Sequence, residues 1–583
     1  MGKFKHIEDF FKKYKWKYIL GIFVLLFVDG LQLITPKILG YVTDALSAHT
    51  LSMKEIFFYA FLIVLIAVFI AAFRYLWRML IIGSSRQLEF WLRNKLFAHL
   101  EKLSLNYFYH NKTGDLMAHA TNDINAVRMA FGMGIVMMTD AIFLTASTII
   151  IMMVSIDIKF TLIALIPFPF VAFIVMFFGK LIQKRFKRVQ EAFSNLTDKA
   201  QESFSGIRVI KSFVQEESEI NNFAKANEAN LKANMNLVKV WGAMSPLVIF
   251  LSALSFVITL YYGGTLVIDK VISLGQLVSF ISYLELLTWP MMAIGHVINV
   301  LQRGIASMTR INEILDTEPE IHDDDNTLDI DNFEESIEFR NLSFTYPGAK
   351  VPALSDINIK LEKGKTLAVI GKTGSGKSTL ANLLLRLYNV EEGSILLGGY
   401  DINKIPIDLL RRKIGYVPQD NFLFSCSIRD NIAFADENMP FEKIEEAAKI
   451  TSVHDDIIGF PNKFDTQLGE RGVTLSGGQK QRVSIARAIA KNPGIMIFDD
   501  CLSAVDTKTE EKILSNLKEV TKDRTSIIIA HRISTVKHAD EIIVLDEGRI
   551  IERGTHDELV ALGGYYSSIY HKQLLEEKIA GQE

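Results

Sequence analysis

Two adjacent carboxylates, Asp499 and Asp500, follow the apolar run 495–498. An apolar run of this length predicts a buried strand. Open α/β sheets bind their ligands outside the carboxyl ends of the strands, which is where these two acids would lie. Because carboxylate oxygens suit hard divalent cations, the pair is a candidate for holding a metal ion at that edge.

A glycine-rich loop, GKTGSGKST at 371–379, follows an apolar run and precedes an apolar helical pattern. Such glycines let backbone N–H groups curl around phosphate, and the helix N-terminus adds a favourable dipole. The loop therefore fits the Walker A pattern and predicts ATP with Mg²⁺. Lys377 would reach the β- and γ-phosphates, Ser378 would ligate Mg²⁺, and Asp499 would lie beside that ion as a Walker B aspartate. The expected ATP-binding residues of the loop are Gly371, Lys372, Thr373, Gly374, Ser375, Gly376, Lys377, Ser378 and Thr379.

A second glycine-rich turn, LSGGQKQR at 475–482, opens an amphipathic helical pattern. Its free N–H groups form another anion site. Since the chain's own Walker A loop already holds the phosphates, the second turn is predicted to serve a nucleotide bound to another copy. The alternative is an ordinary helix N-cap. The residues concerned are Ser476, Gly477, Gly478 and Gln479.

The composition indicates a membrane protein: the 583 residues include 39 Phe and 18 Met, and the mean hydropathy is +0.22. The net charge of −3 argues against a nucleic-acid partner. Each of six apolar stretches reaches the ~20 residues that cross a bilayer. They are 16–36, 55–81, 133–156, 158–180, 240–263 and 273–300. The intervening segments 82–132 and 181–239 are rich in Lys and Arg, which predicts that they, the N-terminus and everything after residue 300 are cytoplasmic.

The second half of the chain has a different pattern of residues. An acidic stretch, 316–336, has no helical or strand period and is interpreted as a solvated linker. In 337–575, short β-branched runs alternate with helical patterns, which predicts an α/β domain with a largely parallel core sheet; 576–583 is a tail. The expected fold class is therefore a six-helix transmembrane domain, 1–315, followed by an α/β P-loop domain. The two cysteines, Cys426 and Cys501, cannot make a disulfide framework.

The order Walker A, LSGGQ and Walker B strand is similar to that of the nucleotide-binding domain of ABC transporters. The resemblance implies that Tyr346 stacks on adenine and that Gln419 contacts Mg²⁺ and relays to the membrane domain. It also implies that His531 is the switch histidine near the γ-phosphate. GERG at 469–472 would contact the intracellular loops, and Asp506 of SAVD would belong to the D-loop at a dimer seam.

The membrane half resembles the same family independently. Segments 106–127 and 202–217 look like the first and second intracellular loops of exporter-type half-transporters, where short helices dock on the ATPase domain. The resemblance covers nearly the whole chain except the tails and the linker. It implies a half-transporter in the cytoplasmic membrane, which must pair with a second half to be complete.

Asp500 departs from the family pattern, in which glutamate follows the Walker B aspartate and polarises the attacking water. Its carboxylate falls short by about one C–C bond, ~1.5 Å. Phosphoryl transfer depends on positioning, so ATP binding should survive while hydrolysis slows. The chain most resembles the degenerate-site subunit of bacterial Firmicutes-type heterodimeric multidrug exporters, whose intact LSGGQ completes the partner's centre. The alternative is that Asp500 is a slower but working base in a homodimer.

Several ionisable groups fall inside the apolar stretches, where a charge costs roughly 2.5–3.5 kcal/mol, and four of them are candidates for a substrate cavity. We expect them to face a wet cavity, where acids would suit cationic amphiphiles, although some of them could simply be solvated. They are Asp29, Asp140, Glu285 and His296. The expected function is ATP-driven efflux of amphipathic compounds. The alternatives are a homodimeric lipid flippase, a peptide exporter or a chiefly regulatory nucleotide-binding subunit; six spans exclude a soluble DNA-repair ATPase.

Overall fold

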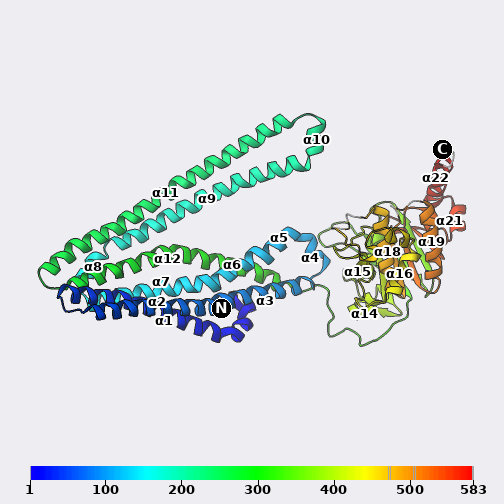
Figure 1. The fold of residues 1–583 in the computed structure, drawn as a ribbon. Coiled ribbons are helices and arrows are strands. Elements are labelled where there is room, and N and C mark those ends of the chain that lie inside the picture. The colour runs from blue at the N-terminus through cyan, green and yellow to red at the C-terminus, as the bar shows by residue number, and fades with distance from the viewer. Residues whose placement is uncertain (1, 470–471, 473–474, 503–504, 506, 581–583) are drawn as a thin grey trace. The chain divides into compact units, whose positions relative to one another are not determined.

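The computed structural model describes residues 2–580 except 470–471, 473–474, 503–504 and 506. The chain forms two compact units (Figure 1). One contains Met1–Glu101 and Thr113–Thr317, and the other contains Lys102–Lys112 and Glu318–Glu583. A short segment inside the first half of the sequence, 102–112, therefore belongs to the unit built mainly from the second half.

The first unit is entirely helical, and six of its described helices are long and apolar enough to cross a membrane. They are Phe4–Ser47, Met53–Leu100, Thr113–Ser155, Ile158–Ser205, Glu216–Ile268 and Leu274–Leu315. The six predicted spans are confirmed as helices, and each continues well beyond the ~20 residues that a bilayer requires. Their regular parts are α1 (Glu8–Ser47), α2 (Met53–Trp77), α3 (Gly83–Leu100), α5 (Thr113–Ala118), α6 (Ile124–Met129), α7 (Ile135–Ser155), α8 (Ile158–Ala164), α9 (Pro167–Ser205), α11 (Glu216–Ile268) and α12 (Leu274–Leu315). Short stretches η1 (Gly2–Ile7), η2 (Arg78–Ile82), η3 (His119–Asp123) and η4 (Ala130–Gly134) complete them.

Helices α1 and α12 approach each other through small residues. A Cβ added at Gly275 would lie 1.9 Å from the carbonyl oxygen of Gly40, so neither glycine can be enlarged without moving the backbone. The Asp44 carboxylate accepts hydrogen bonds from Ser273 Oγ (2.5 Å) and the Gly275 N–H (2.6 Å) at the start of α12. Small residues and interhelical hydrogen bonds are the usual means of joining helices in a membrane, where lipid competes for apolar contacts.

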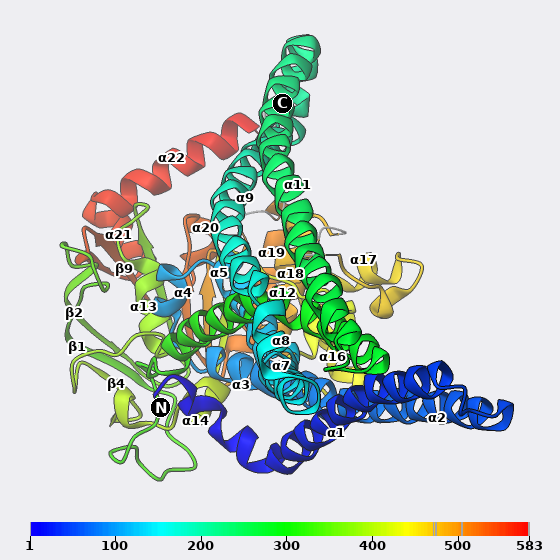
Figure 2. The ribbon, with the colours of Figure 1, turned by 90° about the vertical axis from the view of Figure 1, so that its left-hand side faces the viewer.

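Helices α9 and α11 pack along each other and form an arm that extends away from the other helices of the unit, with α10 (Ile207–Ser212) at its tip (Figures 1 and 2). Large apolar side chains are exposed at this tip: Phe204 is 76% exposed, Val209 62% and Phe213 69%. Contiguous exposed apolar surface usually marks an interaction site. The tip therefore has the character of a docking surface.

The second unit contains two sheets. A six-stranded sheet has the order β10-β9-β3-β8-β7-β6, parallel except for the antiparallel pair β9–β10. Its strands are β3 (Thr366–Gly371), β6 (Ile414–Val417), β7 (Ile495–Asp499), β8 (Thr525–Ile529), β9 (Glu541–Asp546) and β10 (Arg549–Gly554). The other sheet is antiparallel, with the order β2-β1-β4-β5. Its strands are β1 (Ile337–Phe344), β2 (Leu354–Leu361), β4 (Ile395–Leu397) and β5 (Tyr400–Asp401). The predicted α/β fold class with a largely parallel core sheet is confirmed.

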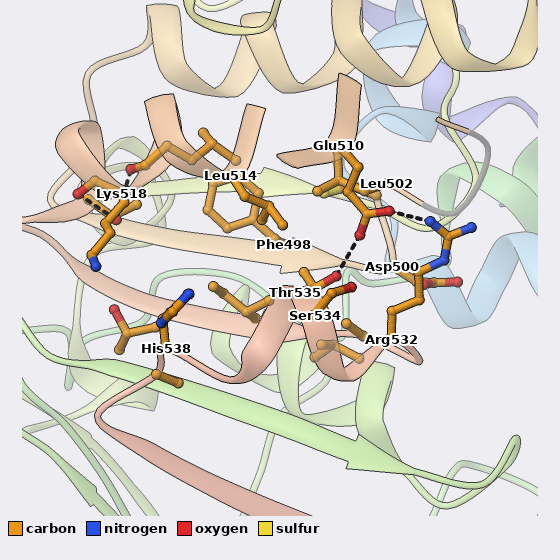
Figure 3. Close-up of a pocket in the computed structure, with 18 of the residues that line it drawn as sticks. Phe498, Asp500, Leu502, Glu510, Leu514, Lys518, Arg532, Ser534, Thr535 and His538 are labelled. Carbon is orange, nitrogen blue, oxygen red and sulfur yellow. Dashed lines mark hydrogen bonds and ion pairs between the residues drawn. The ribbon is translucent and has the colours of Figure 1, made fainter. Parts of the chain in front are cut away.

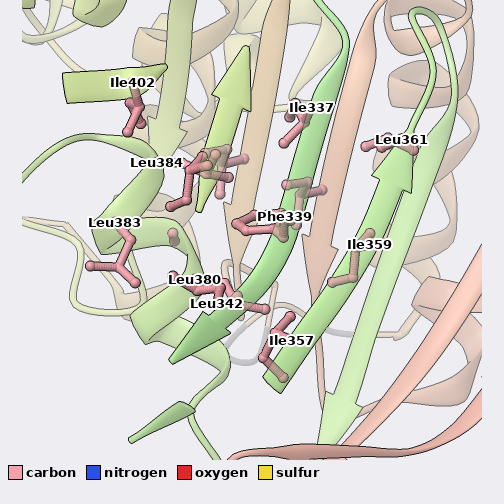
Figure 4. Close-up of a cluster of buried hydrophobic side chains, with 14 of the residues drawn as sticks. Ile337, Phe339, Leu342, Ile357, Ile359, Leu361, Leu380, Leu383, Leu384 and Ile402 are labelled. Carbon is pink, nitrogen blue, oxygen red and sulfur yellow. The ribbon is translucent and has the colours of Figure 1, made fainter. Parts of the chain in front are cut away.

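Helix α13 (Lys377–Leu384), which carries the end of the phosphate loop, is held by a buried apolar cluster. Leu380 and Leu384 point toward Phe339 and other inward-facing residues of the antiparallel sheet (Figure 4). Burying one such side chain contributes about 1.5–3 kcal/mol, so the start of α13 is fixed by its own core. The other helices of the unit are α4 (Leu105–His110), α14 (Ile407–Lys413), α15 (Ile428–Ile432), α16 (Phe441–Ile450), α17 (His454–Ile458), α18 (Gly477–Ala490), α19 (Thr507–Thr521), α20 (Ile533–Val536), α21 (His556–Leu562) and α22 (Tyr565–Ala580).

The sequence analysis interpreted the acidic stretch 316–336 as a solvated linker, but in the structure it makes specific hydrogen bonds. The N–H of Leu328 donates to the carbonyl of Lys404 (2.7 Å), and Asp323 accepts from the N–H of Ile407 (3.1 Å). Glu320 accepts from Ser104 and Asn106, which flank the start of α4, both at 2.9 Å. The linker therefore lies on the second unit and attaches α4 to it.

Candidate functional site

The phosphate loop can adopt its path only with glycine at two positions. A Cβ on Gly371, the last residue of β3, would lie 2.1 Å from the carbonyl oxygen of Leu545 on the neighbouring strand. Gly376 has φ +99°, and a Cβ there would lie 2.5 Å from the carbonyl oxygen of Ala353. Positive φ and close backbone approach are the two situations that require glycine. The loop is therefore held tightly between β3, β9 and the start of α13.

Lys377 is the first residue of α13 and is buried within the loop that it closes. Its Nζ donates to the carbonyls of Gly371 (2.9 Å) and Lys372 (2.7 Å). Burial lowers the pKa of this ammonium group, and the charges of Asp499 and Asp500 oppose that shift. The hydroxyl of Ser375 is buried and has no hydrogen-bond partner among the described residues. An orphan hydroxyl beside a buried cation and a helix N-terminus fits a bound phosphate group.

A cavity of about 410 Å³ opens beside this loop. Its lining brings together most of the residues predicted for the chain's own ATP and Mg²⁺ site, namely Tyr346, Thr373, Gly374, Gly376, Lys377, Ser378, Thr379, Gln419, Asp499, Asp500 and His531. Gly371, Lys372 and Ser375 belong to the same loop but do not line the cavity. Its volume is within the range for a small-molecule site.

The two carboxylates differ in their surroundings although they are neighbours. Asp499, at the end of β7, is 2% exposed and is hydrogen-bonded to the hydroxyls of Ser378 and Tyr416. Burial raises its pKa, an effect that the Ser378 hydrogen bond and Lys377 oppose. The oxygens of Asp499 and Ser378, with Gln419 on the same cavity wall, are the kind of donor set that Mg²⁺ takes.

Asp500 turns out of the strand with φ +45°, while its N–H donates to the carbonyl of Ile529 (2.8 Å). Burial raises the pKa of its carboxyl group, and the charges of His531, Lys377 and Arg532 oppose that shift. A left-handed conformation is uncommon for residues other than glycine, so the local backbone fixes where this short side chain can reach. Asp500 is therefore held at the cavity rather than free to extend further into it.

Tyr346 is positioned by two aromatic neighbours. Its ring meets that of Tyr388 edge to face, with centroids 5.2 Å apart, and that of Phe344 at 5.0 Å. Its hydroxyl donates to Thr379 Oγ1 at 3.0 Å, which ties the ring to α13. A rigidly held ring on the cavity wall is suited to stacking on a base.

Asp500 and His531 also line a second cavity, of about 170 Å³, and Figure 3 shows Asp500 among its lining residues. Phe498 and Leu514 contribute apolar lining there. The buried Glu510 of α19 is paired with Arg532 and accepts from Thr535 Oγ1 (2.8 Å), as the dashed lines show. This network anchors α19 to the segment that follows His531.

Two residues that the sequence did not single out contact the predicted ones. The hydroxyl of Tyr416 reaches Asp499 from β6, three residues before Gln419; its place in YVPQD could have drawn attention to it. Gln573, on the C-terminal helix α22, holds the main chain at His531. No local pattern marks this glutamine.

The LSGGQ turn is not part of the cavity, since none of its described residues lines it. Ser476 is the N-cap of α18, where its Oγ accepts from the N–H of Gln479 (3.3 Å) and its own N–H donates to Gln479 Oε1 (3.0 Å). The ordinary capping role is thus present. Ser476 and Gly477 are exposed, so this helix terminus remains accessible to another molecule. Asp506 and residues 470–471 of GERG lie outside the described residues.

In the membrane unit, three of the four predicted ionisable groups meet. Asp29, Asp140 and Glu285 line a cavity of about 380 Å³ together with Trp289 and Pro290. His296 is exposed on α12 and does not line it. The sequence could place these acids on spans but could not indicate which of them face one another.

Comparisons with known proteins match both halves of the chain. Residues 18–291 match the family described as ABC transporter transmembrane region, and 354–503 match ABC transporter. The chain is 41% identical to a probable multidrug resistance ABC transporter ATP-binding/permease protein, YheI, of Bacillus subtilis, over 98% of this chain and 97% of that protein. It is 38% identical to the multidrug resistance-like ATP-binding protein MdlA of Escherichia coli, over 99% and 97% of the two chains.

One further relative is named for a different function. It is an ATP-dependent lipid A-core flippase of Syntrophus aciditrophicus, 36% identical over 84% of this chain and 81% of that protein. A solved structure of a bacterial Atm1-family ABC exporter with ATP bound superposes with a TM-score of 0.74, at 27% identity, covering 95% of this chain and 98% of that one. The phosphate cradle, the six long helices and these matches agree. The chain belongs to the ABC transporter family, as an exporter-type half-transporter that carries a membrane domain and an ATP-hydrolysing domain on one polypeptide.

Proposed function

We propose that this chain is one subunit of a heterodimeric exporter of amphipathic compounds, in which its own ATP site is slow. The observation that carries the proposal is Asp500, which stands where the family has a glutamate. Its side chain is short by ~1.5 Å, and its backbone conformation, φ +45°, is fixed by the hydrogen bond to Ile529. Because phosphoryl transfer depends on positioning, a water polarised by Asp500 would be misplaced.

The other residues of the site support tight nucleotide binding. Tyr346 would stack on adenine, the loop 371–379 would wrap the phosphates, and Lys377 would leave its loop carbonyls to meet the β- and γ-phosphates. Ser378, Gln419 and Asp499 would hold Mg²⁺, which would neutralise phosphate charge when bound. His531, which lines the same cavity, would contact the γ-phosphate. This chain would therefore hold ATP well and hydrolyse it poorly.

A partner is needed for the complete machine. The exposed N-terminus of α18, with Ser476 and Gly477, lies outside the chain's own cavity and would complete the site of a second subunit, with Asp506 at the seam. The exposed apolar tip of the α9–α11 arm would dock on that subunit as well. The exposed apolar side chains of the tip are costly to leave in water, which supports pairing.

The orientation follows from charge. Lys and Arg are concentrated in 82–132 and 181–239, which would place these segments, the N-terminus and the ATP-binding domain on the cytoplasmic side of the cell membrane. ATP binding would close the two ATPase domains and open the membrane cavity outward. Hydrolysis of ATP at the site on the partner subunit would separate the ATPase domains and return the membrane cavity to its inward-open state.

Amphipathic compounds are the cargo that the relatives' names favour, since two of them are multidrug resistance proteins. Lipid export is the second candidate, because one relative is a lipid A-core flippase. A polar cavity with aromatic and methionine side chains would accept either kind of molecule.

The decisive experiment is to tag this chain in its native membrane, purify it mildly and weigh the intact complex. A stoichiometric second polypeptide with glutamate after its Walker B aspartate is the expected result. A homodimer of this chain that hydrolyses ATP at an ordinary rate would refute both the heterodimer and the slow site.

A further inference from the structure

The cavity of about 380 Å³ in the membrane unit lies among four helices: α1, α2, α7 and α12. Its size is within the range of drug-sized ligand sites. The lining mixes apolar side chains with an unusual number of charged ones. Charged groups at membrane depth are costly, so each requires a counter-charge, a hydrogen-bond partner or a function.

Asp29 is the most deeply buried of these groups, at 2% exposure. Its Oδ1 accepts from Gln32 Nε2 at 3.3 Å, a long hydrogen bond. Its Oδ2 is buried and has no partner among the described residues, and the same is true of Asp140 Oδ1 across the cavity. Two buried carboxylate oxygens without donors are an energetic liability that a ligand with a positive charge would relieve.

The cations of the protein do not satisfy these acids directly. Arg74 Nη2 donates to Gln32 Oε1 at 3.2 Å, so the hydrogen-bonded connection between this guanidinium and Asp29 runs through the amide of Gln32. Among the described residues, no donor reaches Asp29 Oδ2 or Asp140 Oδ1, although the charge of Arg74 acts on both groups from a greater distance. Three carboxyl groups and two guanidinium groups line the cavity.

The remaining walls suit the apolar body of a ligand. Trp77 is buried at 7% exposure, and its Nε1 has no acceptor among the described residues. Trp289 contributes a second indole, with 50% of its surface exposed. Indole rings are the best aromatic partners for organic cations, at about 0.5–2 kcal/mol each.

We propose that this cavity binds amphipathic organic cations, with the cationic group between Asp29 and Asp140, and that Arg74 is the resident counter-ion with which the ligand competes. The inference rests on the proposed export function, for which it names the cargo class. An inorganic cation fits less well, since no described cluster of three or more acidic, His or Cys side chains could hold a metal ion. An anionic lipid headgroup would meet unpaired acceptors rather than donors at Asp29 and Asp140.

Tetraphenylphosphonium and tetraphenylborate test the proposal, because they have nearly the same size and apolar surface but opposite charge. Binding of each to the purified, full-length chain with its native partner is measured by equilibrium dialysis without ATP. The wild type should bind the phosphonium at least about tenfold more tightly than the borate. Asp29→Asn with Asp140→Asn should lower phosphonium affinity about tenfold or more, and Arg74→Gln should raise it severalfold.

The matched control is Asp269→Asn, which removes an exposed carboxylate from the turn after α11 in the same unit and should leave both affinities unchanged. ATP affinity and elution volume verify that each variant is folded. Unchanged phosphonium binding in the double variant would overturn the proposal. A preference for the borate that disappears in Arg74→Gln would also overturn it and favour an anionic headgroup.

The proposed export function can fail separately. ATP-dependent uptake of phosphonium into inverted vesicles tests it with the same proteins. Binding that depends on Asp29 and Asp140, but without uptake of any amphiphile, would leave the cation site standing and refute export. Uptake of uncharged amphiphiles without phosphonium binding would refute the cation site alone.

Discussion

Gln573 forms hydrogen bonds with the main chain on both sides of Arg532, at His531 and at Ile533. Its Nε2 donates to the carbonyl of His531 at 2.9 Å, and its Oε1 accepts from the N–H of Ile533 at 2.8 Å. Both bonds come from one amide on α22, 42 and 40 residues further along the chain. A side chain that closes both ends of a short segment fixes the direction in which the intervening residues point. The C-terminal helix therefore holds the main chain at His531.

Replacing Gln573 should disturb hydrolysis without disturbing ATP binding. In an Asp500→Glu background, which gives this chain a full-length acid, Gln573→Ala should lower turnover at this site roughly 3- to 10-fold, because a displacement of ~1 Å is costly for catalysis. Gln573→Glu is the matched control, since it keeps the acceptor for the Ile533 N–H but loses the donor to the His531 carbonyl. Its turnover should lie between that of the Asp500→Glu background and that of Gln573→Ala. The readout is kcat for ATP against its KM. An equal rise in KM would indicate a general loss of structure instead.

Asp500→Glu should by itself accelerate hydrolysis at this site, by about 10- to 100-fold. The measurement is the fraction of nucleotide crosslinked to this chain that has lost its γ-phosphate, which separates this site from the partner's. Wild type should retain the γ-phosphate, and the glutamate variant should lose it. Asp500→Asn, which removes the charge at the same length, should be no faster than wild type. A wild-type site that empties as fast as the glutamate variant would show that Asp500 is a competent base.

The sequence was sufficient for the fold class and for much of the nucleotide site. Periodicity identified the six membrane helices and the two apolar runs that form β3 and β7, whose ends carry the phosphate loop and Asp499. These elements are encoded locally, since an apolar run of the right length and the glycines after it leave few other folds.

Contacts between distant segments were not predictable. The pairing of Gln573 with His531 and that of Glu320 with Ser104 join residues 42 and 216 positions apart. Neither contact leaves a periodic signal, because each depends on one side chain at the end of a helix or in a loop. The same is true of the relay from Arg74 through Gln32 to Asp29: the sequence showed charges in spans, but only the helix packing determines which of them meet.

The ring of Tyr346 should matter for ATP affinity and its hydroxyl should not. Base stacking on an aromatic side chain contributes about 1–3 kcal/mol, so Tyr346→Ala should weaken ATP binding about tenfold or more. Tyr346→Phe loses only the hydrogen bond to Thr379 and keeps the edge contacts with Phe344 and Tyr388. It should bind ATP within about twofold of wild type. Equal losses in the two variants, measured with a fluorescent ATP analogue, would point to the hydroxyl instead.

Glu320 should be required for coupling rather than for hydrolysis itself. Its carboxylate accepts from Ser104 Oγ and Asn106 Nδ2, so Glu320→Ala removes two charge-assisted hydrogen bonds that attach α4 to the linker. Stimulation of ATPase activity by an amphipathic compound should fall about threefold or more, while the basal rate is retained. Glu318→Ala removes an exposed acid two residues earlier and serves as the control. Intact stimulation in Glu320→Ala would mean that α4 is held by its apolar contacts alone.

Glu335 should give the ATPase unit part of its resistance to acid. Burial opposes ionisation of this carboxyl group, but hydrogen bonds from Lys413 and Lys363, both 2.9 Å long, outweigh it and lower the pKa to about 2. In an unfolded chain the value is about 4.3. A depressed folded pKa contributes stability that is fully present above about pH 4.3 and is lost as the pH falls toward about 2.

Glu335→Gln should therefore lower the unfolding temperature of the ATPase unit by roughly 1–3 °C at pH 7. The difference from wild type should shrink as the pH falls below about 4.3, because the wild-type carboxylate becomes protonated and loses the same interactions. Glu338→Gln, which removes a more exposed carboxylate paired with Arg340 on β1, should have a smaller effect at pH 7. The unfolding temperatures of wild type and variants are measured by far-UV circular dichroism at several pH values. If the difference in unfolding temperature between wild type and Glu335→Gln stayed constant from pH 7 to pH 3, the ion pairs of Glu335 with Lys363 and Lys413 would not be its cause. The packing of the side chain would be its cause instead.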